Sequence, residues 1–221
     1  MTATARVSSL IASMTVVTAA AVLRRRQLRW GTNHAEITTR LAGDELVAEP
    51  DLTATRAITI HAGVDDVWPW IVQLGQGRGG FYSYDSLENL IGCDIHSAIR
   101  IHPGWQHLDV GDAVRLAPEL ALKVAVAKPP RTLVLRGGVL PGTTIAPYDF
   151  TWTFDLSPVS AATTRLVVRE RYAYTRWWAR LMVEPLTVVS FLMSRRMLHG
   201  IRYRAEQTSQ RGSNRAGTGK P

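Results

Sequence analysis

Residues Asp149–Leu156 alternate apolar and polar side chains more regularly than any other stretch of the chain. One set comprises Phe150, Trp152, Phe154 and Leu156, and the other comprises Thr151, Thr153 and Asp155. Successive side chains of a β-strand point to opposite faces, so this pattern predicts a strand with one face in a core. After a turn at Pro158–Thr163, a second strand is expected over Thr164–Tyr174. Its two faces carry Leu166, Val168, Glu170 and Tyr172 against Arg165, Val167, Arg169 and Arg171.

Other segments complete the expected fold. Shorter strands are predicted over Thr55–His61, Asp112–Ala117, Leu120–Ala127 and Leu133–Arg136, with a loop over residues 141–147. Two short helices are predicted, one from Asp65 to Gly75 and one over Ser83–Ile91, the latter with Leu87, Leu90 and Ile91 inward. Trp177–Gln207 is expected to be a long helix, laying Leu186, Val189, Met193, Met197 and Ile201 over the sheet. The order predicts an α+β fold in which a curved antiparallel sheet surrounds a long C-terminal helix and leaves a cavity.

The net charge of +8 is confined to the two ends of the chain. Residues 1–29 carry +5 and residues 195–221 carry +6, so residues 30–194 carry −3. This distribution argues against a nucleic-acid-binding surface and favours basic ends near an anionic membrane. For the basic cluster in residues 195–221, the alternative to a membrane contact is that its arginines are solvated. No metal or cofactor is expected, because Cys93 is the only cysteine and His96, His102 and His107 lack the spacing of a helical metal site.

The first residues predict a hydrophobic anchor helix. Val7–Leu23 has no charged residue and is followed by three arginines, Arg24–Arg26. A helix of this length rises about 26 Å, which is short for a bilayer core of about 30 Å. A weak anchor at the cytoplasmic membrane, single-pass or peripheral, is expected, with the following domain facing the cytoplasm. A cleaved signal ending near Ala19–Ala21 is the alternative.

The chain is therefore divided into four parts. Residues 1–29 form the anchor with its basic flank, 30–54 a connector, 55–208 the globular domain and 209–221 a disordered basic tail.

The glycine-rich stretch Gly75–Ile95 is the expected entrance of the cavity. Phe81, Tyr82 and Tyr84 would line it, and Arg78 would meet a polar head group. The apolar wall is expected to contain Trp68, Trp152 and Met193. Glu170 is either a buried carboxylate opposite Trp152 or a sheet-edge residue paired with an arginine, and Glu88 could do acid–base work beside Asp85. Cys93 is expected to behave as a small buried hydrophobe rather than a nucleophile.

Residues from about Trp30 to Gln207 resemble the SRPBCC superfamily, also called START-like or polyketide cyclase/dehydrase-like. The similarity is closest to an actinobacterial-type branch that carries VWPW and GGFYSYD. The matching pieces are ITIHAGVDDVWPWIVQLGQGRGGFYSYDSLENLIG, WQHLDVGDAVRLAP, YDFTWTFDL and TRLVVRERY. The resemblance implies a helix-grip fold with a lipophilic cavity. It implies no particular activity, because the superfamily includes lipid and hormone binders, cyclases, hydrolase activators and ring-oxygenase subunits.

Three functions are compatible with these features. The leading hypothesis is a membrane-tethered domain that binds or transports a hydrophobic or amphipathic small molecule, lipid or polyketide-like. Its ligand-binding residues would be Trp68, Arg78, Phe81, Tyr82, Tyr84, Glu88, Trp152, Glu170 and Met193. The alternative is a cyclase or dehydratase in which Tyr82, Glu88 or His96 transfers protons. A third hypothesis is an interaction module with a collapsed cavity, whose basic ends recruit a partner or a lipid surface.

Overall fold

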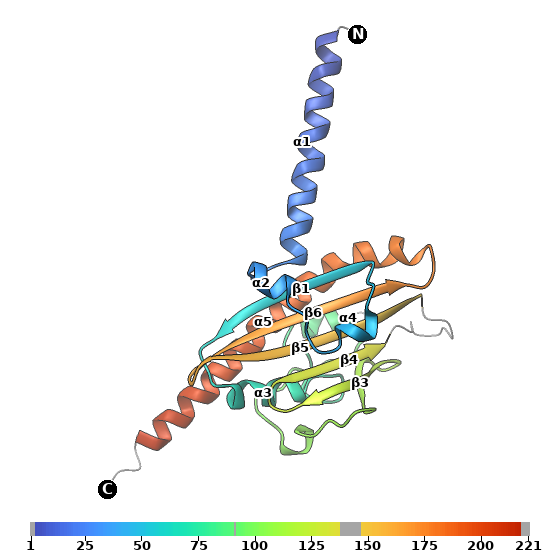
Figure 1. Ribbon diagram of the computed structural model, residues 1–221. Coiled ribbons are helices and arrows are strands. Elements are labelled where there is room, and N and C mark those ends of the chain that lie inside the picture. The colour runs from blue at the N-terminus through green and yellow to red at the C-terminus, as the bar shows by residue number, and fades with distance from the viewer. Residues whose placement is uncertain (1–2, 91, 138–146, 218–221) are drawn as a thin grey trace.

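Six strands form a single antiparallel sheet in the computed structural model, which describes residues 3–90, 92–137 and 147–217 (Figure 1). The strand order is β1-β6-β5-β4-β3-β2. The strands are β1 (Leu52–Ile60), β2 (Ala113–Ala117), β3 (Leu120–Lys128), β4 (Thr132–Gly137), β5 (Tyr148–Ser160) and β6 (Thr163–Tyr174). The long helix α5 (Ala179–Gly217) follows the sheet and runs along it. This is the α+β helix-grip fold that the sequence predicts.

The β5–β6 hairpin lies at the centre of the arrangement. Its register places Trp152 opposite Glu170, and Phe150 opposite Tyr172. The two apolar sets expected from alternation therefore share the inner face of the sheet, which α3 (Val64–Val72) and α5 cover. The core between these layers includes Phe154, Leu156, Leu166, Val168, Met197 and Ile201.

The opposite, outer face of the hairpin is also covered. The segment expected to be a connector contains α2 (His34–Thr38) and a 3₁₀ turn, η1 (Asp44–Val47). Arginines of β6 hold it: Arg165 reaches Glu36 over 2.7 Å, and Arg169 Nη1 donates to Asp44 Oδ2 over 2.6 Å. Thr153 on β5 is buried beneath it and donates to the carbonyl of Ala42. The sheet is thus the middle layer of three.

Helix α4 is shorter and differently oriented than expected. It spans Asp85–Leu90, and a 3₁₀ turn, η2 (Pro103–Trp105), follows farther along the chain. Leu87 and Leu90, which were expected to face inward, are 50% and 81% exposed, whereas Glu88 is buried. Ile91 and most of the loop expected over residues 141–147 lie outside the described residues.

The apolar stripe predicted for α5 is correct only in its C-terminal half. Met197 and Ile201 are buried, but Leu186 and Val189 are about half exposed. From Ala179 to Ser194 the buried positions are Ala179, Val183, Thr187 and Ser194. Hydroxyl groups therefore occupy positions where the hydropathy pattern predicts apolar side chains. The helix continues to Gly217, into the segment expected to be a disordered tail.

Helix α1 (Ala3–Leu28) extends away from the domain (Figure 1). Near its end Arg24 donates to Glu184 and Thr187 of α5, and Gln27 also bonds Thr187. None of the helices in the described part of the chain combines the length and apolarity needed to cross a bilayer. The expected single-pass localisation is therefore wrong: the uncharged part of α1 ends at Arg24 after about 26 Å of helix.

Candidate ligand cavity between the sheet and the C-terminal helix

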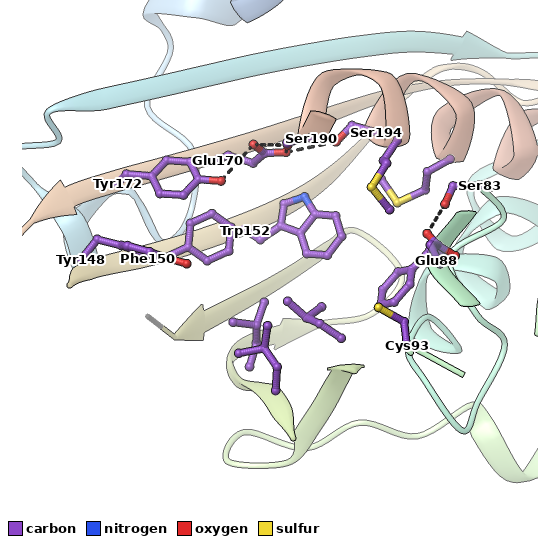
Figure 2. A pocket seen from close by; sticks show the side chains of 16 residues that line it. Ser83, Glu88, Cys93, Tyr148, Phe150, Trp152, Glu170, Tyr172, Ser190 and Ser194 are labelled. Carbon is purple, nitrogen blue, oxygen red and sulfur yellow. Dashed lines mark hydrogen bonds between the residues drawn. The ribbon is translucent and has the colours of Figure 1, made fainter. Parts of the chain in front are cut away.

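A cavity of about 260 Å³ lies between the inner face of the sheet and α5 (Figure 2). Strands β2, β3, β5 and β6, helix α5 and the segment from Phe81 to Cys93 bound it. Most of its wall is aromatic or aliphatic, with Phe81, Leu116, Leu120, Leu122, Tyr148, Phe150, Trp152, Tyr172, Met193 and Met197. Five residues expected at the site meet here: Phe81, Glu88, Trp152, Glu170 and Met193.

One polar end of the cavity is built around Glu170 on β6. Its side chain is 4% exposed, and Arg56 Nη1 donates to its Oε1 over 2.6 Å. The hydroxyls of Ser190 and Ser194, one turn apart on α5, donate to the same carboxylate over 3.0 and 3.1 Å. Figure 2 shows the two serine bonds together with that from Tyr172, whose hydroxyl lies 3.4 Å from Oε2. Glu170 is the buried carboxylate opposite Trp152 that was one of the two expectations; it is paired with an arginine, but β6 lies between β1 and β5 and so is not at the sheet edge.

Arg56 is fully buried behind this carboxylate. It shares the inner face of β1 with Ile58 and Ile60, as period-two spacing requires. Its guanidinium carbon lies 5.8 Å from the centre of the Phe191 ring, and Nε and Nη2 have no hydrogen-bond partner among the described residues. Arg56 is not part of the cavity wall, so its charge is directed at Glu170.

The other polar end is formed by Glu88 on α4. The residue is 2% exposed, and the Ser83 hydroxyl donates to Oε1. Oε2 has no partner among the described residues. Burial raises the pKa of Glu88, against the hydrogen bond from Ser83, which lowers it. Its neighbour Asp85 accepts hydrogen bonds from the amide and hydroxyl of Ser97, which fixes the loop.

Trp152 stands between the two polar ends in Figure 2. Its ring packs against Phe154 at 4.8 Å and Phe81 at 6.1 Å between centroids. The buried indole Nε1 has no acceptor among the described residues. Cys93 lies nearby in the wall, and burial raises the pKa of its thiol, which disfavours the reactive thiolate.

Tyr82 lies outside the cavity, contrary to expectation. Its hydroxyl accepts from Gln73 Nε2 over 2.9 Å and donates to the carbonyl of Trp70 over 3.1 Å. Arg204 of α5 covers the ring, 4.5 Å from its centre. Burial raises the pKa of Tyr82 far above its ordinary value, so the phenol stays protonated. The residue joins the α3 region to α5 and is not placed to transfer protons to a ligand.

Four other expected residues also lie elsewhere. Arg78 donates to the carbonyls of Val72 and Trp105 and so closes the glycine-rich turn. Trp68 packs in the core outside the cavity wall. Tyr84 is 44% exposed beside Arg196, and His96 is exposed. These positions argue against a head-group contact at Arg78 and against proton transfer by His96.

The sequence reasoning missed Arg56, Ser190 and Ser194. For Arg56 a signal existed, because it shares the strand face of Ile58 and Ile60, just as Glu170 shares that of Leu166 and Val168. Two opposite charges on the apolar faces of two strands predict a buried ion pair if the strands are neighbours. The serines gave no signal, because they interrupt the apolar pattern of α5.

No protein-family model matches the chain, and no curated protein matches it either. Solved structures with a similar course of the chain include a Nitrosospira multiformis protein, 18% identical, with a TM-score of 0.48 over 72% of this chain and 99% of that one. A Mesorhizobium loti protein is 14% identical, with a TM-score of 0.43 over 71% and 98%. The di-domain ARO/CYC BexL from the BE-7585A biosynthetic pathway is 13% identical, with a TM-score of 0.38 over 70% and 46%. Likenesses of this degree carry no conclusion about what this chain binds.

Proposed function

We propose that this protein binds a small, mostly apolar molecule in the cavity between the sheet and α5. The observation that carries the proposal is the combination of an aromatic and aliphatic wall with a few buried polar groups at defined places, which is typical of ligand pockets. A volume of about 260 Å³ lies just below the usual range for such pockets, about 300–1,000 Å³, and suits a small ligand of about 15 non-hydrogen atoms at most.

The resemblance to the SRPBCC superfamily supports the same proposal, since it implies a lipophilic cavity in this position. Membership in that superfamily and a lipid or polyketide-like ligand are part of the proposal.

A pair of tryptophan variants on α5 tests it. Met193 lines the cavity, so Met193→Trp fills the space, whereas the neighbouring Leu192 is 51% exposed and Leu192→Trp adds the same group outside. A neutral, polarity-sensitive naphthalene dye reports occupancy by its blue-shifted fluorescence. Wild type and Leu192→Trp are expected to bind it alike, and Met193→Trp at least about tenfold more weakly. Equal binding by all three would contradict the proposal, provided that thermal unfolding shows all three folded.

The buried carboxyl of Glu88 favours a second candidate, an enzyme that transfers a proton to or from the bound molecule. Of the three groups considered for this role, only Glu88 lies in the cavity wall. Native mass spectrometry of the protein from its own host tests this candidate. If Glu88 catalyses loss of water from the bound molecule, Glu88→Gln retains a species heavier by one water than that bound by wild type. The same mass in both would contradict a dehydration.

A further inference from the structure

The first half of α5 carries its polar and apolar side chains on the reverse of the usual sides. Its buried positions include Thr187 and Ser194, whose hydroxyls form hydrogen bonds with charged side chains. Four exposed apolar residues, spaced four, three and four positions apart, form a row that points outward: Leu181, Pro185, Val188 and Leu192. Exposed apolar surface of this kind marks an interaction site.

Two exposed tryptophans extend this row toward the start of α5. Trp177 comes four residues before Leu181 and is 84% exposed, and Trp178 follows it at 40%. Tryptophan is enriched among the residues that contribute most to binding at protein interfaces. With the half-exposed Val189, these residues make up a surface that we call the outer apolar face: Trp177, Trp178, Leu181, Pro185, Val188, Val189 and Leu192.

Basic groups stand at both ends of the outer apolar face. Arg176 precedes it, and Arg195 and Arg196 follow it. All three are exposed, and none takes part in an ion pair among the described residues. The rings of Trp30 and Tyr84 lie 5.6 and 5.9 Å from the guanidinium carbons of Arg195 and Arg196, and these contacts leave the two charges without a counter-ion.

The middle of the outer apolar face has no unpaired charge. Residues 181–194 rise about 20 Å as a helix, and their single charged side chain, Glu184, is paired with Arg24 and Arg180. An anionic lipid surface is charged throughout, so it does not match basic ends that an uncharged stretch separates. A second copy of α5, parallel or antiparallel, would bring basic ends together, which is repulsive. The complementary partner is apolar in its middle and acidic at its ends.

We propose that the outer apolar face binds a helical segment of a partner protein that is about four turns long, apolar along one side and acidic at both ends. Such a segment packs its apolar side chains, at spacings of three and four residues, between those of α5. Its carboxylates reach Arg176 at one end and Arg195 with Arg196 at the other. No residue of the outer apolar face belongs to the described cavity wall, so this interaction does not depend on the binding function proposed above.

Selection from a display library of random peptides of about 20 residues, with the full chain as the target, tests this partner chemistry. Enriched peptides are expected to carry apolar residues at helical spacing and Asp or Glu in both end turns. The most enriched peptide, and a copy with Lys in place of every Asp and Glu, are then titrated by fluorescence anisotropy. The acidic peptide is expected to bind at least about tenfold more tightly than the lysine copy, and its affinity should fall as salt is added.

Double variants assign the binding to the outer apolar face. Val188→Gln with Leu192→Gln is expected to weaken binding of the acidic peptide at least about tenfold. The matched control, Leu87→Gln with Leu90→Gln, changes two exposed apolar residues of α4 and is expected to bind the peptide as wild type does. All four side chains are half exposed or more, so both variants are expected to stay folded, which thermal unfolding verifies.

A third double variant tests the charged contact without changing the apolar surface. Arg195→Gln with Arg196→Gln is expected to weaken the acidic peptide and to reduce the dependence of its affinity on salt.

Three results would overturn the proposal. The first is a selection that enriches no acidic helical peptide. The second is an acidic peptide that binds the Val188 and Leu192 double variant as tightly as wild type, because it then occupies another surface. The third is that this double variant loses self-association, or binding to vesicles of phosphatidylglycerol and phosphatidylcholine, while no peptide depends on the face. The outer apolar face would then pair with a second copy or with a lipid surface instead.

Discussion

Arg56 Nη1 donates to Glu170 Oε1 over 2.6 Å, and the two side chains are 1% and 4% exposed. The residues stand on neighbouring strands, where Ala54 of β1 is the register partner of Glu170. A buried charge that loses its counter-ion is much more costly than the absence of both charges. Each residue therefore depends on the other for its place in the core.

Removal of one partner is expected to be more harmful than removal of both. Glu170→Gln should lower the free energy of unfolding by about 3–5 kcal/mol, because Arg56 then lacks its counter-ion. The double variant Arg56→Met with Glu170→Leu should recover most of this loss. Urea unfolding measures the free energy of unfolding of the single and the double variant. Asp149→Asn, which breaks the more exposed pair with Arg136, is the control and should cost less than about 1 kcal/mol. A double variant no more stable than Glu170→Gln would contradict the expectation.

The stability contribution of Glu88 is expected to decrease as the pH rises. Its pKa in the folded protein is raised above about 4.5, so the folded state holds the proton more tightly than the unfolded chain. Relative to Glu88→Gln, wild type should be most stable below about pH 4.5 and should lose that advantage as the pH passes the folded pKa. Denaturant unfolding over the acidic to neutral range measures this difference. Ser83→Ala removes the hydrogen bond that lowers this pKa and should move the loss to higher pH; a difference independent of pH would refute the raised pKa.

Gly200 is expected to be intolerant of a side chain. A Cβ there would lie 2.4 Å from the carbonyl oxygen of Tyr82, whose backbone already has a φ of 56°. Gly200→Ala should therefore destabilise the protein by about 1–3 kcal/mol. Gly212, on the same helix, has nothing within 4 Å of its Cβ position, so Gly212→Ala should be neutral or slightly stabilising. Thermal unfolding measures the change in melting temperature of each variant. Equal changes in Gly200→Ala and Gly212→Ala would show that α5 can move away from Tyr82.

Arg169 is expected to hold residues 34–47 on the sheet. It donates to Asp44 and also to the carbonyls of Glu36 and Thr39. Arg169→Met should leave the buried Asp44 with only the longer, 3.5 Å ion pair to Arg171 and the amide of Leu41, and should speed hydrogen exchange of the Leu46 amide, which donates to the carbonyl of Gly43.

Asp44→Asn in the same chain should restore part of the protection, because the buried charge that has lost its closest counter-ion is gone. Unchanged exchange at Leu46 in Arg169→Met would mean that other contacts hold the segment.

The hairpin was predictable because its alternation reflects burial directly. Phe150, Phe154 and Leu156 are buried on the inner face as expected. The burial of Thr151 and Thr153 was not predictable from the same pattern, because the layer that covers them comes from a polar segment about a hundred residues earlier in the chain. Threonine is compatible with either a solvent-exposed or a covered strand face.

The candidate site was predictable where a residue's own strand or loop decides its direction. Phe81, Trp152 and Glu170 line the cavity, as the pattern indicated. Tyr82 does not, because the chain turns at this residue and buries its ring against Arg204 of a distant helix. The inner face of α5 was misassigned in its first half because hydropathy ignores hydrogen bonds: Ser194 is buried by its bond to Glu170, not by its apolarity.

The three-layer arrangement gives the cavity one stiff wall and one compliant wall. Hydrogen-bonded strands held from behind by the arginines of β6 resist bending, so the sheet fixes the depth of the cavity. The opposite wall contains Glu88 of the six-residue helix α4 and, from α5, Ser190, Met193, Ser194 and Met197, which follow the half-exposed Leu186 and Val189. A ligand larger than the present volume would therefore be accommodated by movement of these helices, and the strain of binding it would appear there first.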